Sequence, residues 1–468
     1  MFSARIKLSY TLVSVLAVNL LATSGDITMT WTSPIYPKLH SNDSTINPIG
    51  RAISRDEDGW IGSLVNVGAM FGPLPFSLVS ERFGRKIGLL SIAIPHIIAF
   101  MTMAFAESVY LFYLGRLLGG IAVGGGYTLL PMYIAEVSEA ANRGAYSSTL
   151  GIFWAFGNFI PNAVGPFMSV MWFNLLLTCF PVAFFITFFF LGKETPYFLV
   201  GANKIDEAEE VLMKLRCLDT KGVEIELNQI KTNLKKEESG SYSDIFKNQG
   251  LRRAFIISLI LMALQQLCGM NAVNYYLQTI LQESGSKLPS DISSLIVGFG
   301  MFLFSFLVPP VMDRLGRKVL LASSCAGMGL SMFLLGSYFY IKDHTDWSVE
   351  PIYWLPLLSL VFLIFSYQMG VSIVPWAISS ELFPKNVKQV TATAVSTTAC
   401  VSTFLVTRFF NNMTESLGAA GTFWCFTCCC SICLIFTCCF VPETKGKSYE
   451  EIQNMVQKWS TEKNSNEV

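Results

Sequence analysis

The feature that most constrains this chain is a series of uncharged stretches, each long enough to cross a lipid bilayer. A helix needs about 20 apolar residues to span the hydrocarbon core. Runs of that size without Asp, Glu, Lys or Arg occupy 59–80, 87–106, 117–135, 254–282, 292–312, 319–341, 351–380, 389–407 and 416–442. Because lipid cannot satisfy backbone polar groups, each run is predicted to be a membrane helix.

Two further regions complete the set of predicted spans. The longest uncharged stretch, 145–192, has 48 residues, and Asn162, Gly165 and Pro166 near its middle predict a tight turn between two spans. Residues 8–30 add a first span, which gives twelve. The composition agrees, because charged residues make up 14% of the chain against about 25% in soluble proteins. The fold class predicted is an all-α membrane protein with twelve transmembrane helices.

The basic residues predict the orientation of these helices, since Lys and Arg concentrate in cytosolic loops. With twelve spans, 26 basic residues fall on the side of the two termini and five on the opposite side, while Arg116 and Arg408 lie within or at the edge of spans. Both termini of this multi-pass protein are therefore predicted to be cytosolic, and the glycosylation sequon at Asn42 in an exterior loop favours the plasma membrane. Residues 8–22 also fit a cleaved signal peptide, which would leave the later topology unchanged.

The charges near the membrane ends repeat six spans apart. The hexapeptide Glu81-Arg-Phe-Gly-Arg-Lys86 matches 313–318, and the spacing from Glu136 to Arg143 matches that from Glu381 to Lys388. Such parallel repeats build transporters that rock around a midplane site. The predicted organisation is a six-helix half (1–192), a cytosolic linker with short amphipathic helices (193–250), a second half (251–441) and a cytosolic tail (442–468).

Several function classes find no support in the sequence. The 33 basic and 33 acidic residues cancel, which removes the electrostatic case for nucleic-acid binding. The three histidines lie far apart, and no glycine-rich phosphate loop followed by Lys-Ser or Lys-Thr occurs. Neither a metal, a cofactor nor an enzymatic activity is expected. The predicted partners are the lipid bilayer and a small solute, with the monomer as the working unit.

Several motifs, taken together and in order, resemble the sugar porter family of the major facilitator superfamily over nearly the whole chain. The insect facilitated trehalose transporters are the most similar group within it. The motifs are Glu81–Lys86, Gly115-Arg116 with Gly119-Gly120, Pro131-x-Tyr133-x-x-Glu136, Arg143-Gly144, Glu194-Thr-Pro196, Gln265-Gln266-x-x-Gly269-x-Asn271, Tyr275-Tyr276, Asp313–Lys318, Pro375-Trp376, Glu381-Leu-Phe383 and Pro442–Gly446. The resemblance implies a twelve-helix fold, a central sugar site and alternating access.

The seventh predicted span carries the residue types that a sugar requires. A sugar is neutral, so its hydroxyls need uncharged donors and acceptors and its apolar faces need aromatic rings. The candidate substrate-binding residues on this span are Gln265, Gln266, Asn271, Asn274 and Tyr275, and Trp376 on the tenth span resembles the stacking tryptophan of the family. Gln265 and Asn271 would point about 120° apart on a continuous helix, so a bend is expected near Gly269. Hydrogen bonds that only join helices are the alternative for the two glutamines, helix packing for the tyrosines, and interfacial anchoring for Trp376.

The cytosolic charges predict a gate in which ion pairs join the halves in one state and separate in the other. Its residues recur at fixed offsets in the two repeats, whereas topological anchoring by positive charge alone would not require the acids. The candidate gating residues are Glu81, Arg82, Arg85, Glu136, Arg143, Asp313, Arg314, Arg317, Glu381 and Lys388.

Departures from the family pattern leave the substrate and the mechanism open. Gly151 stands where the fifth helix often carries Gln, and Thr403 lies where relatives place a more polar group. The first span holds Asp26, and an ionisable residue inside a span is a functional hypothesis by default. Asp26 with Arg116 would serve a proton symporter, the alternative to facilitated diffusion of trehalose or a hexose. A non-transporting sugar receptor is a third possibility, and Asn42 is a candidate glycan acceptor in the first exterior loop.

Overall fold

The computed structural model describes residues 10–445 except 140–141, 237–244, 246, 286, 307–314 and 384, together with 451–452 and 455. The chain divides into two compact units. Unit 1 contains 1–31, 38–53 and 64–237, and unit 2 contains 32–37, 54–63 and 238–468. Each unit is a bundle of helices.

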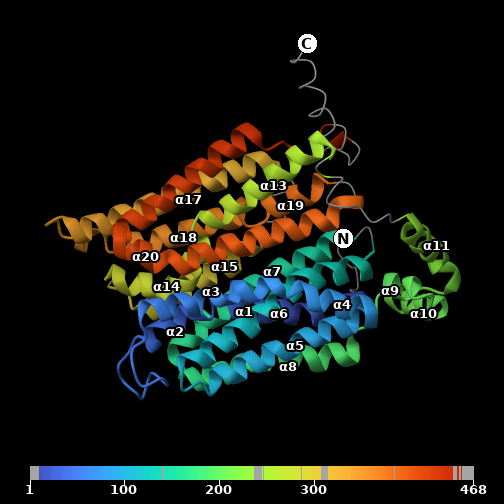
Figure 1. Cartoon of the computed structure of the whole chain (residues 1–468), viewed down its shortest axis with the longest axis horizontal. Helices are drawn as coiled ribbons and strands as arrows, with labels where there is room; N and C mark the ends of the chain where they lie inside the picture. Colours follow the sequence, from blue (N-terminus) through green and yellow to red (C-terminus); the bar gives the residue numbers. More distant parts are fainter. Residues whose placement is uncertain are drawn as a thin grey trace, which may run out of the picture. The chain divides into compact units, whose positions relative to one another are not determined.

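The first six spans run from α1 to α8 (Figure 1). Helix α1 packs against α6, α7 and α8, and α5 packs against α6 and α8. Glycines on α6 make part of this packing possible, because a Cβ at Gly124 would lie 2.3 Å from the carbonyl oxygen of Ala69. Their bounds are α1 (Tyr10–Thr30), α2 (Thr32–Leu39), α3 (Arg55–Phe71), α4 (Pro73–Phe83), α5 (Arg85–Ala104), α6 (Val109–Val137), α7 (Arg143–Val164) and α8 (Val170–Leu191).

The predicted turn inside 145–192 is confirmed. Helix α7 ends at Val164, a 3-10 turn covers Gly165–Phe167, and α8 begins at Val170. Ser169 caps α8 by accepting a hydrogen bond from the Trp172 backbone N–H, which satisfies a donor that the first helical turn would leave unpaired. The side chain of Lys38 donates to the carbonyl oxygens of Gly165 and Met168 and so holds the turn from outside.

Unit 2 carries the remaining spans, two of which are interrupted. Helix α17 packs along both α18 and α20, and α13 packs along α20. The tenth span changes to a π-helical turn at Tyr367–Val371, and α20 contains a non-helical residue at Gly418. The elements are α13 (Gln249–Leu267), α14 (Met270–Ser284), α15 (Ser290–Ser305), α17 (Arg317–His344), α18 (Leu355–Ser366), η3 (Tyr367–Val371), α19 (Val374–Glu381) and α20 (Lys385–Phe440).

The described helices account for twelve membrane spans. Nine helical stretches are long and apolar enough to cross a membrane, and the last of them, Val390–Phe440, is 51 residues long and holds two spans joined at Gly418. Helix α7, with 22 residues, and the shorter apolar α15 supply the other two. The predicted twelve-helix membrane fold is confirmed.

The linker forms the amphipathic helices that its periodicity predicts. They are α9 (Pro196–Gly201), α10 (Ile205–Arg216) and α11 (Thr220–Lys236), which lie at one end of the unit 1 helices (Figure 1). Arg216 donates to the Val137 carbonyl oxygen at the end of α6 over 2.8 Å and to Glu226 of α11 over 2.6 Å. The hydroxyl of Thr11 on α1 donates to the Leu215 carbonyl oxygen over 2.9 Å. The linker helices therefore pack against the ends of α1 and α6.

Candidate functional site

The seventh span breaks where the sequence predicts a bend. Helix α13 ends at Leu267, Gly269 has φ +85°, and α14 starts at Met270. A positive φ of this size favours glycine, because a Cβ would meet the neighbouring carbonyl oxygen. The aromatic ring of Phe426 on α20 fills the space beside this residue, and a Cβ at Gly269 would lie 2.6 Å from it. The break therefore depends on glycine for two separate reasons.

Four polar side chains meet at this break. Asn271 donates to the Gln266 side-chain oxygen over 2.5 Å, and Thr403 of α20 donates to the same oxygen over 3.0 Å. Asn271 also lies 3.3 Å from the Thr403 hydroxyl, and Gln266 donates to Gln265 over 3.4 Å. The break thus turns Gln265, Gln266 and Asn271 toward one another, as predicted, in a cluster that carries no charge.

The side chain of Gln265 ties this cluster to the tenth span. It is 3% exposed and donates to the carbonyl oxygens of Val371 and Ser372 over 2.6 and 3.2 Å. The Val371 carbonyl oxygen can accept a side-chain donor because the residue four positions later is Pro375, which has no N–H to offer it. Pro375 lies in the first turn of α19, where its missing N–H costs nothing. Two interrupted helices are therefore joined through one amide.

The other predicted substrate-binding residues are arranged differently. Asn274 is half-buried one turn beyond Asn271, and Trp376 on α19 is 42% exposed. Tyr275 is buried, and its neighbour Tyr276 is stacked between the rings of Tyr36 and Phe410 at centroid distances of 5.0 and 4.7 Å.

Two of the predicted gating residues of the first repeat, Arg85 and Glu136, belong to a compact network at the start of α5. Arg85 and Glu136 are paired at 3.4 Å, and Glu136 also accepts from the Thr195 hydroxyl over 2.5 Å. The carboxylate of Glu194 accepts the backbone N–H groups of Arg85 and Lys86, so it caps the N-terminus of α5. Burial raises the pKa of Glu194, and the backbone N–H groups that it accepts offset part of this effect.

The second repeat reproduces the ion pair and the helix cap of this network, whereas Thr444 does not repeat the hydrogen bond that Thr195 donates to Glu136. Arg317 pairs with Glu381 at 3.5 Å, and Glu443 accepts the backbone N–H groups of Arg317 and Lys318 at the start of α17. Burial acts to raise the pKa of Glu443, but the N–H groups of Lys445, Lys318, Arg317 and Thr444 outweigh it and hold that pKa below its ordinary value. Equivalent contacts at equivalent positions support the internal duplication.

The remaining gating candidates divide into two groups. Glu81, Arg82 and Arg143 are exposed, with Glu81 and Arg82 in the last turns of α4 and Arg143 at the start of α7. Asp313 and Arg314 lie outside the described residues, as does the side chain of Lys388.

Asp26 and Arg116 occupy the interior of unit 1. Asp26 is 8% exposed and accepts a hydrogen bond from the Tyr127 hydroxyl over 3.5 Å. Arg116 is fully buried, donates to the Thr28 carbonyl oxygen and lies 5.5 Å from the ring centre of Trp31. A buried carboxyl group beside a phenol is a place where a proton can be held.

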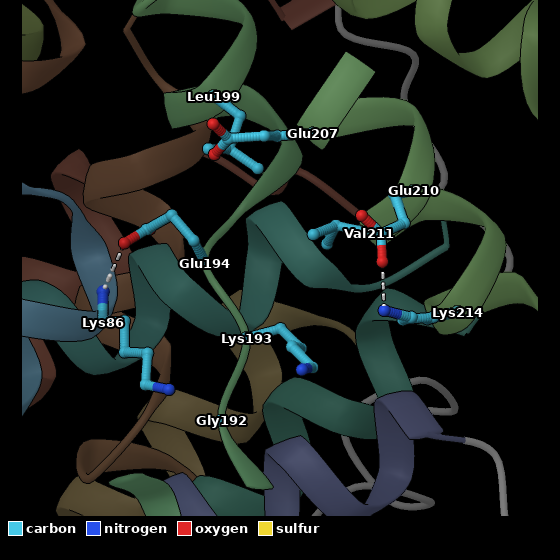
Figure 2. Close-up of a pocket in the computed structure, with 9 residues that line it drawn as sticks. All are labelled: Lys86, Gly192, Lys193, Glu194, Leu199, Glu207, Glu210, Val211 and Lys214. Carbon is cyan, nitrogen blue, oxygen red and sulfur yellow. Dashed lines mark hydrogen bonds and ion pairs between the residues drawn. The ribbon is translucent and has the colours of Figure 1, made fainter. Parts of the chain in front are cut away.

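A cavity of about 310 Å³ lies where the linker meets the end of α5 (Figure 2). Its lining includes three lysines and three glutamates. The Glu194 carboxylate accepts the backbone N–H of Lys86, and Lys214 forms an ion pair with Glu210. A neutral sugar requires uncharged partners, so the cavity is not assigned to the substrate.

Two residues that were not among the predicted site residues, Thr403 and Arg408, also make contacts of this kind. Thr403 joins the amide cluster, and its only sequence signal was its place on a span where relatives are more polar. Arg408 makes several contacts in unit 2, and its signal was a basic residue at the edge of an apolar span. The candidate glycan acceptor Asn42 is exposed in the loop after α2, where its side-chain oxygen accepts the Ala52 N–H over 3.2 Å.

The family model described as sugar (and other) transporter matches residues 29–456. The chain belongs to this family. Among its relatives is the facilitated trehalose transporter Tret1 of Bombyx mori, 34% identical over 409 residues that cover 86% of this chain and 79% of the relative. The Tret1 of Apis mellifera ligustica is 31% identical over 448 residues, which cover 94% of this chain and 87% of that protein.

Solved structures show that this family member shares its fold with known transporters. The inward open conformation of the xylose transporter XylE from E. coli matches with a TM-score of 0.76 at 23% identity, covering 94% of this chain and 99% of that one. XylE is also described as a proton:xylose symporter of the major facilitator superfamily, in a structure that matches with a TM-score of 0.70 at 24% identity. At this identity the likeness establishes the fold alone.

Proposed function

We propose that this sugar transporter carries a small neutral sugar, trehalose or a hexose, down its gradient by alternating access. The observation that carries the proposal is the uncharged cluster of Gln265, Gln266, Asn271 and Thr403 at the break of the seventh span. Its amides and hydroxyl supply both donors and acceptors, which suits sugar hydroxyls that leave water. Asn274, Tyr275 and Trp376 complete the proposed site when the halves rearrange around the sugar.

Two features favour a sugar as large as trehalose. The relatives named above are trehalose transporters by their descriptions. Gly151, at a position where many relatives carry Gln, has no atom within 4 Å of where a Cβ would lie. The missing side chain leaves room that a second sugar ring could use. We place the protein in the plasma membrane as a monomer, with cytosolic termini and a glycan on Asn42.

The experiment that tests this function is uptake of radiolabelled trehalose and glucose into oocytes, with and without a proton uncoupler. Facilitated diffusion predicts that uptake stops at the external concentration and that the uncoupler does not change it. Asp26→Asn should then transport at the wild-type rate. Sugar binding without any uptake would favour the receptor instead.

A proton symporter is the second candidate, and the burial of Asp26 against Tyr127 is the observation that favours it. In that case uptake should exceed the external concentration, and the uncoupler should abolish the excess. Asp26→Asn should also lose the accumulation while it retains exchange of labelled sugar. The same uptake curves therefore decide between the two candidates.

The repeated charge networks are proposed to form the cytosolic gate. The pairs Arg85–Glu136 and Arg317–Glu381 hold each repeat together in this structure, and exposed charges such as Arg143 are available to pair when the halves approach. Arg143→Ala should slow transport about fivefold, the effect of losing an ion pair worth about 1 kcal/mol. Surface expression should stay normal. The control Lys204→Ala removes a linker lysine that pairs with Glu207, and equal rates in the two variants would exclude the gate role of Arg143.

A further inference from the structure

Arg408 lies at an unusual place for an arginine, near the end of an apolar span in the first part of α20. Its side chain is 15% exposed and forms an ion pair with Asp56. The guanidinium carbon lies 4.9 Å from the ring centre of Trp60 and 5.8 Å from that of Phe409. An arginine that is shielded from water, paired and stacked on an indole binds more tightly than an exposed one.

The contact extends over the first turns of α3. A Cβ at Gly59 would lie 3.0 Å from an Arg408 guanidinium nitrogen and 3.1 Å from its carbonyl oxygen, so the helix rests directly on Arg408. Arg55 pairs with Glu415 at 2.9 Å, and its carbonyl oxygen accepts from Asn411 over 3.3 Å. The Arg55–Glu415 pair is mostly exposed, with 62% and 52% of the two side chains accessible.

The position of this segment in the chain makes the contact significant. Residues 54–63 belong to unit 2, although the rest of α3, from Leu64 onward, belongs to unit 1. Tyr36 is a second example, because it lies in 32–37, which also belongs to unit 2. Its ring stacks on Tyr276, and its hydroxyl donates to the Asp58 carbonyl oxygen over 3.0 Å. A transporter of this kind rocks around a central site. In the state that opens this end of the protein, residues 54–63 must therefore separate from Arg408 and α20.

We propose that Arg408 is a gating residue, and that the cluster of Arg408, Asp56 and Trp60 is a latch that closes the exterior end of the transporter. The latch is separate from the cytosolic charge networks, and it acts when the cytosolic gate is open. The proposal rests on the function and orientation proposed above. Because the latch stabilises the exterior-closed state, its loss should raise the share of empty transporters that face outward.

The test compares the KM for trehalose entry with the KM for trehalose exit in oocytes. A larger outward-facing population lowers the KM for entry relative to exit, so Arg408→Gln should lower this ratio about three- to tenfold. A merely structural role would reduce the amount of protein and the maximal rates without moving the ratio. Arg408→Lys keeps the charge and should fall between the wild type and Arg408→Gln. The matched control is Glu415→Gln, which breaks the exposed pair beside the latch and should change the ratio less than twofold.

A second measurement does not depend on the substrate. Hydrogen–deuterium exchange of the purified protein should show faster deuterium uptake over residues 54–63 in Arg408→Gln, but not in Glu415→Gln. Unchanged exchange together with an unchanged KM ratio would overturn the latch. Faster exchange in a protein that carries no trehalose would support the latch and refute trehalose as substrate. A KM ratio that shifts in the opposite direction would support the latch and refute the proposed orientation.

Discussion

Replacing Gln266 with leucine is expected to lower the ratio of maximal uptake rate to KM about 100-fold. The Gln266 side-chain oxygen accepts from both Asn271 and Thr403, so leucine would remove the acceptor that the half-buried Asn271 and the buried Thr403 share, together with a partner for the sugar. Each buried group left unsatisfied costs about 1–3 kcal/mol, and about 2.7 kcal/mol corresponds to 100-fold. Uptake of labelled sugar, normalised to the amount of protein at the cell surface, measures the effect.

Gln282 provides the matched control for this substitution. It lies on α14, the same helix as Asn271, but its side chain is exposed. Gln282→Leu makes the same chemical change outside the amide cluster and should retain nearly full transport. If both variants lost transport equally, or if Gln266→Leu kept the wild-type ratio, the amide cluster would not be the sugar site.

Gly269→Ala is expected to be the most damaging single-methyl substitution in the seventh span. The left-handed backbone costs alanine about 1–2 kcal/mol, and the new methyl group would meet the Phe426 ring at 2.6 Å, which adds about 1–3 kcal/mol of overpacking. The sum, about 3 kcal/mol, should lower the melting temperature of the purified protein by several degrees. Transport should fall further, because the break that brings Gln266 and Asn271 together would be distorted.

Two variants separate the backbone effect from the steric one. Gly285 also has a positive φ, of +67°, but a Cβ there would come no closer than 4.0 Å to a lysine side-chain carbon. Gly285→Ala should therefore show the backbone cost alone. Adding Phe426→Ala to Gly269→Ala should restore part of the melting temperature by removing the clash. If Gly269→Ala melted at the same temperature as Gly285→Ala, the Phe426 ring would not constrain the break.

Local sequence signals were sufficient for the spans and for two of the sites where the helices turn or break. The turn at Gly165 and the break at Gly269 were both predicted, because glycine and proline act on the backbone within one or two residues. The charge repeats were visible for a similar reason, since helix caps such as Glu194 and Glu443 must keep a fixed relation to the helices they cap.

Contacts between distant segments could not be predicted in the same way. Thr403 meets Gln266 across 137 residues of sequence, and Gln265 reaches the Val371 carbonyl oxygen across 106. The ring of Tyr276 likewise stacks on Tyr36, which lies near the start of the chain. Which polar groups converge depends on helix rotation and crossing, and these depend on packing over the whole bundle.

By itself, the sequence determined the twelve spans, and it predicted the duplication and the orientation. Each of these follows from how single residues interact with lipid, water or their own backbone, and such interactions need no distant partner. Tertiary structure decided which uncharged groups share a hydrogen bond at the break of the seventh span. It also decided that residues 54–63 pack with Arg408 rather than with the rest of their own half. These outcomes depend on side chains far apart in the chain, whose meeting only the packed bundle determines.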